Sequence, residues 1–256
     1  MAVGLDADTE YARRASIPSG TAGTLSDGGF TNCFVGVWLY RPSAGNSLAL
    51  TSSGAILHFK SGAREVKLGF DNTFGSGDAS GPLLQIIFNS GGGTGSVQTF
   101  SGANFLDEWV YYFILDNSTS GQIAGYIRLS SIGSATTITR ANDNAGSQYI
   151  NTLTIGNYDV AAETVFGHYA YARARYATGI TVANVLTAAA SSAPIAGDWG
   201  FWPLDDNADT GDDSGNSRTL TFGGTLTTQT SPTLGGGGAT TSSVPTRRFP
   251  FSILMH

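Results

Sequence analysis

Short runs of apolar residues recur along the chain, and Gly, Asn, Asp or Ser bounds each of them. The strongest run, residues 33–40 (CFVGVWLY), is apolar on both faces, as a strand inside a two-layer sandwich would be. Two further runs, residues 109–115 and 123–129, are joined by a segment (DNSTSG) whose residue types favour a hairpin turn. This pattern predicts many short strands connected by turns.

The composition also favours strands over helices. Charged residues make up only 12% of the 256 residues, whereas the exposed faces of helical bundles need many Glu, Lys and Arg. Only residues 181–190 have a helical pattern, with Thr181 as the predicted N-cap. The sequence therefore predicts an all-β fold, a two-sheet antiparallel jelly-roll sandwich with one short helix near 181–190. The predicted core residues are Phe34, Trp38, Leu68, Ile86, Phe113, Ile127 and Ile155.

Several classes of protein are disfavoured by the same sequence. The N-terminus lacks the basic and apolar regions of a signal peptide, and no stretch is long and apolar enough for a membrane-spanning helix. A net charge of −6 disfavours nucleic-acid binding, which needs a basic surface. Cys33 is the single cysteine, so we expect a buried thiol rather than a disulfide or a zinc site. We expect a chain made in a cytoplasm, with no membrane or nucleic-acid partner.

Four segments occur in an order that resembles the concanavalin A-like, laminin-G-like sandwich family. They are Leu5-Asp6 to Tyr11, then Phe30-Thr31 before Trp38, then Trp109 with Asp116, then Leu153-Thr154-Ile155-Gly156. Residues 166–176 (FGHYAYARARY), followed by Gly179-Ile180-Thr181, are similar to the family's last motif. The resemblance implies a two-sheet sandwich, and sandwiches of this kind occur among phage surface proteins.

The order of one further motif departs from the family. Trp202-Pro203-Leu204-Asp205 followed by Asp213-Ser214-Gly215-Asn216 is similar to an opening that usually precedes the first segment, yet here it comes last. A permuted order, or a partial second copy, would explain this. We favour permutation and expect residues 199–222 to pair beside the first strand, within one domain spanning residues 1–230.

The resemblance also implies two enzyme classes, because some sandwiches of this fold are glycoside hydrolases or alginate lyases. Hydrolysis needs two carboxylates across the scissile bond, but Asp107 and Glu108 are adjacent rather than alternating. A lyase constellation around His168 fails because a two-residue period places His168 on the face opposite Arg173 and Arg175. We therefore predict that the chain is not an enzyme.

Two groups of residues are candidate binding sites. Tyr169, Tyr171, Arg173 and Arg175 share one face of a predicted strand, which could bind carbohydrate, contact a partner protein or simply face solvent. Asp205, Asn207 and Asp209 have the spacing of a calcium loop, although Gly211 falls one place late for an EF-hand. A solvated acidic turn is the favoured alternative there, so calcium is the one cofactor that we consider and otherwise we expect none.

Residues 231–256 form a Gly-rich linker and an apolar, basic C-terminal arm. The arm carries Arg247, Arg248, Phe249, Phe251, Ile253 and Leu254. Its alternating apolar residues would let an extended segment dock on a neighbouring subunit, on another protein or back on its own sandwich. We interpret the chain as a structural or interaction protein of a virus particle, a capsid decoration or tail-associated protein located in the virion. Its partners would be other virion proteins, copies of itself or cell-surface glycans. The alternative is a bacterial lectin-like carbohydrate-binding module.

Overall fold

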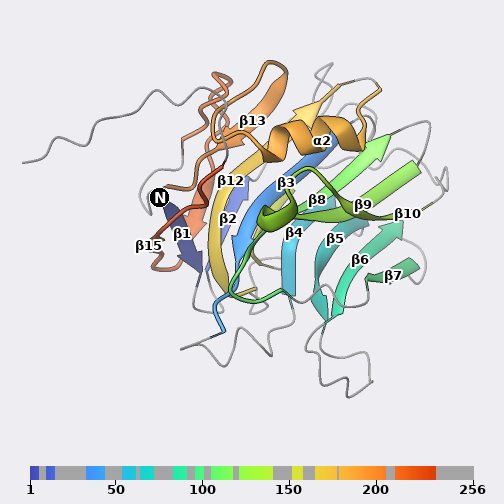
Figure 1. Ribbon diagram of the computed structural model, residues 1–256, viewed down its shortest axis with the longest axis horizontal. Coiled ribbons are helices and arrows are strands. Elements are labelled where there is room, and N and C mark those ends of the chain that lie inside the picture. The colour runs from blue at the N-terminus through green and yellow to red at the C-terminus, as the bar shows by residue number, and fades with distance from the viewer. Residues whose placement is uncertain are drawn as a thin grey trace, which may run out of the picture.

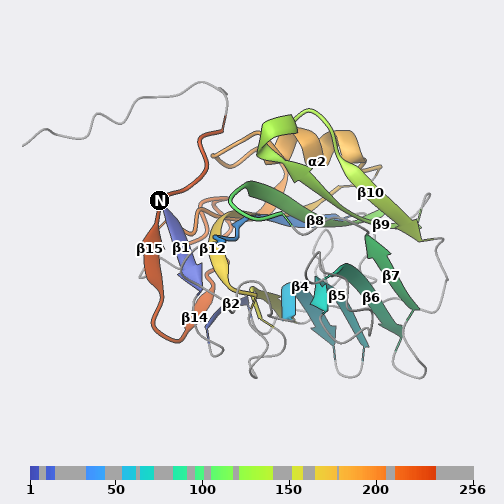
Figure 2. The same ribbon diagram turned by 60° about the horizontal axis from the view of Figure 1, so that its bottom comes forward.

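The computed structural model describes residues 1–5, 10–14, 33–43, 54–61, 64–71, 83–90, 96–100, 105–117, 121–140, 152–157, 165–177, 179–205 and 211–234. Within these ranges the strands form two antiparallel sheets (Figure 1). Figure 2 shows the two sheets as stacked layers, with a helix on the outside of the upper one. The prediction of an all-β, two-sheet jelly-roll sandwich is confirmed.

The larger sheet contains eight of the described strands, in the order β10-β9-β8-β3-β12-β1-β15, with β13 paired to β12 beside this path. Their bounds are β1 Ala2–Leu5, β3 Cys33–Tyr40, β8 Trp109–Asn117, β9 Gly121–Arg128, β10 Thr136–Arg140, β12 Gly167–Tyr176, β13 Asp198–Trp202 and β15 Thr227–Gln229. The runs that are most apolar in the sequence, β3 and β8, lie side by side in its middle, where neighbours cover both of their edges.

The smaller sheet contains seven described strands in the order β14-β2-β11-β4-β5-β6-β7. Their bounds are β2 Tyr11–Arg14, β4 Gly54–Ser61, β5 Arg64–Asp71, β6 Leu83–Ser90, β7 Ser96–Phe100, β11 Thr152–Ile155 and β14 Thr221–Gly223. Strands β4 to β7 follow one another in sequence and in space.

The C-terminal strands pair with the N-terminal ones in both sheets. Strand β14 lies beside β2, and β15 lies beside β1. We expected residues 199–222 to pair beside the first strand. Instead residues 227–229 take that position, while β13 pairs with β12. The final segment thus contributes an edge strand to each sheet.

Helix α2 (Val182–Ala189) is the predicted short helix, and Thr181 is its N-cap. The Thr181 backbone N–H donates a hydrogen bond of 2.8 Å to Oδ1 of Asn184, which satisfies a donor at the start of the helix. A 3-10 turn, η1 (Leu129–Ser131), lies near α2 on the same side of the larger sheet (Figure 1). No helix in the described ranges is long and apolar enough to span a membrane.

Buried side chains fill two separate regions. The inner core lies between the sheets and includes Leu68 and Ile155, whereas the outer cluster lies between the larger sheet and α2 and includes Trp38 and Val185. Of the seven predicted core residues, six are buried: Phe34, Trp38, Leu68, Phe113, Ile127 and Ile155. The side chain of the seventh, Ile86, lies outside the described part. The sequence did not reveal that four of the six belong to the outer cluster.

Candidate functional site

Three aromatic rings form a row across three neighbouring central strands of the larger sheet, near one end of those strands. Tyr40 ends β3, Trp109 begins β8 and His168 lies at the start of β12, and the registers place Tyr40 opposite both of the others. The ring centroids of Tyr40 and Trp109 are 5.6 Å apart. Those of Tyr40 and His168 are 5.5 Å apart, with the ring planes inclined by only 19°. We call these three residues the aromatic row.

The aromatic row lies where the outer face of the larger sheet reaches the surface. Side chains two residues apart on a strand share a face, so Tyr40 points to the same side as Trp38. Trp38 is fully buried, and its indole N–H donates a hydrogen bond of 3.1 Å to the carbonyl oxygen of Ala189 at the end of α2. Tyr40, Trp109 and His168 are half-buried. The row is therefore a part of this face that an external molecule can contact.

The loop before β8 places a carboxylate beside the row. Asp107 has a φ of +56°, a left-handed conformation that Asp tolerates better than most residues, and its N–H donates a hydrogen bond of 2.8 Å to the carbonyl oxygen of Arg41. Its carboxylate accepts hydrogen bonds from the backbone N–H of Ser43, at 2.8 Å, and from the Ser43 hydroxyl. These bonds, with a further one from Tyr40, hold the pKa of Asp107 below its ordinary value. The exposed carboxylate is consequently charged at neutral pH.

The next residue, Glu108, forms an ion pair. Its Oε2 lies 2.8 Å from Nε and 2.6 Å from Nη2 of Arg128, and its Oε1 accepts hydrogen bonds from the hydroxyl and the backbone N–H of Ser130. Burial alone would raise the pKa of Glu108, but the bonds from Arg128 and Ser130 outweigh it and lower this pKa. The Arg128 guanidinium also lies over the Phe105 ring, 4.7 Å from its centroid. Arg128 itself is 44% exposed, so it can still donate to an external group.

This arrangement suits recognition better than acid–base catalysis. Half-buried rings can contact C–H groups, and the neighbouring carboxylate and hydroxyls can bond to hydroxyl groups. A general acid working near neutral pH needs a raised pKa, whereas the pKa values of Asp107 and Glu108 are both lowered. Because the two residues are adjacent in the loop, they also do not face each other across a cleft as a hydrolase pair would.

The predicted Tyr/Arg face is interrupted by a β-bulge, so that prediction is partly wrong. Strand β12 pairs Ala170 with Trp38 and Arg173 with Gly36, which leaves one extra residue on β12. Tyr171 has a φ of +48°, and its N–H donates a hydrogen bond of 2.9 Å to the carbonyl oxygen of Pro203. The bulge reverses the alternation, which the simple two-residue period did not anticipate.

The bulge separates the four residues. Tyr169 is 1% exposed in the inner core, where its hydroxyl donates to the carbonyl oxygen of Val165 at 2.7 Å. Arg173, also 1% exposed, lies on the other face with the outer cluster. Tyr171 and Arg175 are half-buried, and the Tyr171 ring is stacked on Phe201. Tyr169 and Arg173 therefore cannot belong to an exposed surface, while a binding role for Tyr171 and Arg175 stays a prediction.

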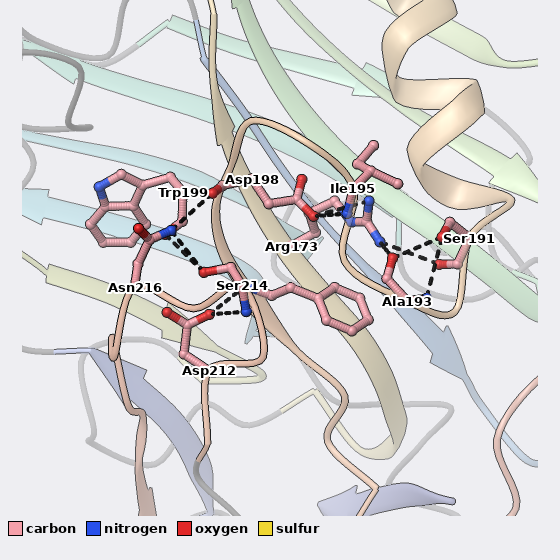
Figure 3. Close-up of polar contacts among 10 residues, drawn as sticks. Arg173, Ser191, Ala193, Ile195, Asp198, Trp199, Asp212, Ser214 and Asn216 are labelled. Carbon is pink, nitrogen blue, oxygen red and sulfur yellow. Dashed lines mark hydrogen bonds and ion pairs between the residues drawn. The ribbon is translucent and has the colours of Figure 1, made fainter. Parts of the chain in front are cut away.

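Arg173 has a structural partner instead of a ligand. Its Nη1 lies 3.2 Å from Oδ2 of Asp198, and its Nη2 donates 2.7 Å to the carbonyl oxygen of Ala193 (Figure 3). Asp198 Oδ2 in turn accepts a hydrogen bond of 2.8 Å from the N–H of Ile195. Burial lowers the pKa of Arg173, because water no longer stabilises its charge. This ion pair fixes the loop that leads from α2 to β13.

The Asp213-Ser214-Gly215-Asn216 motif after β13, with Asp212 directly before it, also has a structural role. Asp212 Oδ1 accepts hydrogen bonds from the N–H groups of Phe201, at 3.0 Å, and Ser214, at 2.9 Å. Asn216 Nδ2 donates at 3.1 Å to the carbonyl oxygens of both Asp198 and Trp199 (Figure 3). The motif thus holds the loop against β13.

The two remaining predicted sites lie wholly or mostly outside the described residues. Asp205 of the predicted calcium loop is half-buried, whereas Asn207 and Asp209 lie outside the described part, and so does the arm with Arg247 and Phe249. Within the described part, no three His, Cys, Asp or Glu side chains are grouped as a metal site would require. Calcium binding and docking by the arm stay predictions.

Comparison with known proteins supports the fold. No protein-family model matches the chain, and no characterised protein sequence is significantly similar to it. A structure from Bacteroides ovatus, described as a proposed carbohydrate-binding protein, has a TM-score of 0.52 and 12% identity over 89% of this chain. The match spans 62% of the length of that protein.

Two other solved structures are more distant. A heptameric pentraxin from Limulus polyphemus, described as SAP-like, has a TM-score of 0.48 and 12% identity over 87% of this chain and 94% of its own. Tailspike protein 2 of an Escherichia coli O157:H7 bacteriophage has a TM-score of 0.44 and 11% identity over 61% of this chain and 21% of its own. At 12% identity the Bacteroides ovatus structure supports the fold alone, and the family stays a prediction.

Proposed function

We propose that the chain is a non-catalytic recognition protein that binds glycans through the aromatic row. The observation that carries the proposal is the joint position of Tyr40, Trp109 and His168 beside the charged carboxylate of Asp107, which is hydrogen-bonded to Tyr40. Sugars present C–H faces and hydroxyls together, and the site offers complementary groups for both. The Bacteroides ovatus protein with the same fold is described as a proposed carbohydrate-binding protein, which agrees with this function. Since fold alone does not define function, the argument rests on the site.

We further propose that the glycan site belongs to a virus particle, in a capsid decoration or tail-associated protein. The support comes from the sequence: a compact, weakly charged domain is followed by a Gly-rich linker and an apolar arm. A bacterial lectin-like module is the alternative. Genomic context separates the two, because a gene between capsid and tail genes supports the virion role. A gene beside enzymes that degrade polysaccharides supports the alternative.

Glycan binding can be tested on an array of oligosaccharides with purified wild-type chain, Tyr40→Ala and His168→Ala. Each variant removes one ring of the row, and we expect at least about fivefold weaker binding, because a stacked ring contributes on the order of 1 kcal/mol or more. The matched control is Tyr11→Ala, which removes a half-buried ring from β2 of the other sheet. Unfolding curves show whether each variant is folded. Failure of the wild type to bind any glycan, or equal losses in all three variants, would contradict the proposal.

The arm can be tested by deleting residues 235–256, which begin after the described part of the chain. We expect the sandwich to remain folded, because the described strands of both sheets and the described residues of both cores lie within residues 1–234. Assembly on virion proteins, measured by co-sedimentation with purified particles, should weaken. Undiminished assembly of the truncated chain would show that the arm is not the docking segment.

A further inference from the structure

We propose that the aromatic row selects neutral, hydroxyl-rich glycans over glycans that carry carboxylate or sulfate groups, and that Asp107 sets this preference. The inference rests on the proposed glycan-binding function and adds the class of ligand. It comes from the charges around the row rather than from the rings themselves.

The described charges beside the row leave one negative charge unpaired. Glu108 and Arg128 form a bidentate ion pair and largely neutralise each other. Asp107 is instead bonded to the neutral groups of Ser43 and Tyr40, so its charge persists at the surface. The formal charge of the whole chain, −6, has the same sign. The nearby Asp107 carboxylate and the net negative charge of the chain would therefore both repel an anionic sugar placed on the row.

The nearest buried cation does not offset Asp107. Arg41 follows Tyr40 in the chain, but its side chain points to the opposite face, where its guanidinium lies 4.2 Å from the centroid of the Phe70 ring in the inner core. Its pKa is lowered by burial, because the interior does not solvate its charge as water would. The cation is thus on the far side of the sheet from a ligand bound at the row.

A neutral sugar, by contrast, is not repelled by Asp107. The Asp107 carboxylate can accept a hydrogen bond from a sugar hydroxyl. A carboxylate or sulfate group of an anionic sugar has no proton to donate to it at neutral pH. The charge beside the row therefore favours uncharged, hydroxyl-rich sugars.

The test uses matched glycans and Asp107→Asn. A neutral oligosaccharide and the same oligosaccharide with one terminal sialic acid are titrated into the full chain at pH 8, where an ordinary histidine is neutral. We expect the sialylated glycan to bind about three- to tenfold more weakly at low salt, and this ratio should shrink at high salt. In Asp107→Asn the ratio should fall towards one, because Asn tolerates the same φ but carries no charge. The ratio is the readout, since any loss of affinity common to both glycans cancels in it.

The control is Asp213→Asn, which removes the same charge from an exposed residue on the loop after β13. It should leave the ratio unchanged. If the wild type binds the sialylated glycan as tightly as the neutral one, or more tightly, the proposed preference for neutral glycans is wrong, whereas the proposed glycan-binding function is retained. If Asp213→Asn changes the ratio as much as Asp107→Asn does, net charge rather than Asp107 sets the preference. If neither glycan binds, the proposed function fails and the inference fails with it.

Discussion

The two faces of the larger sheet are closed in different ways. A complete second sheet covers the inner face, and the inner core takes residues from both layers. Among the described residues, the eight-residue helix α2, the turn η1 and the loop that Arg173 and Asp198 hold lie over the outer face. The inner face thus packs against a second sheet, whereas Tyr40 at the end of β3 is half-buried on the outer face. The candidate binding site lies at this end of β3.

The inner and outer faces of the larger sheet also differ in the interactions that close them. The inner core is closed mainly by apolar packing, which is non-directional and depends on buried area. The outer cover depends on a few directional contacts, including the Trp38 hydrogen bond to Ala189 and the buried ion pair. Directional contacts position a loop more sharply, but the loss of one partner leaves the other unsatisfied. The outer side should consequently respond most strongly to single polar substitutions.

The largest effect is expected from Asp198→Ala, which leaves the Arg173 guanidinium buried without its carboxylate. We expect the free energy of unfolding to fall by about 3–5 kcal/mol in urea titrations. The double variant Arg173→Met with Asp198→Ala should recover much of that loss, because it removes the unpaired charge as well. A loss below about 1 kcal/mol for Asp198→Ala would mean that the ion pair does not hold the outer cover.

Two Leu→Ala substitutions compare the two cores directly. Leu68 is fully buried in the inner core, and its truncation should cost about 2–5 kcal/mol in the same urea titrations. Leu186 of α2 packs half-buried against the outer cluster, and its truncation should cost about 1 kcal/mol, because less apolar area leaves the interior. Equal costs at the two positions would show that α2 closes the outer face as fully as the second sheet closes the inner one.

The smallest effect is a pH dependence at the ion pair of Glu108 and Arg128. The folded chain lowers the pKa of Glu108, so the unfolded chain binds the proton more readily. The stabilisation from its bonds to Arg128 and Ser130 is present above the unfolded pKa and is lost as the pH falls through the folded one. We expect Glu108→Gln to flatten the stability curve below about pH 5, in urea titrations between pH 3 and 7. An unchanged slope would show that the pair contributes nothing measurable.

Much of the fold could be predicted because its signals are local. The apolar runs became β3, β8 and β9, and the predicted helix became α2 with its Thr181 cap. The sequence also showed that β3 is apolar on both faces. It did not show that Val37 faces the inner core while Trp38 faces α2. An apolar run indicates that its residues are buried but not which element covers them.

The site could not be predicted, because it depends on contacts distant in sequence. Tyr40, Trp109 and His168 come from three separate runs, and only the strand registers bring them together. The bulge at Tyr171 left no clear signal either, since Tyr rarely adopts a positive φ. Assuming an unbroken period of two therefore placed Tyr169 and Arg173 on one exposed face, whereas both are buried and lie on opposite faces.

The most direct test of the account is the intrinsic fluorescence of Trp109 during glycan titration. Of the four tryptophans, Trp38, Trp199 and Trp202 are buried at 5% exposure or less, and only Trp109 is half-buried in the aromatic row. A bound neutral glycan should protect Trp109 from acrylamide quenching and shift its emission, and Trp109→Phe should abolish this response while the chain stays folded. Glycan binding with no change in fluorescence, or with a response that persists in Trp109→Phe, would place the binding site elsewhere and contradict the account.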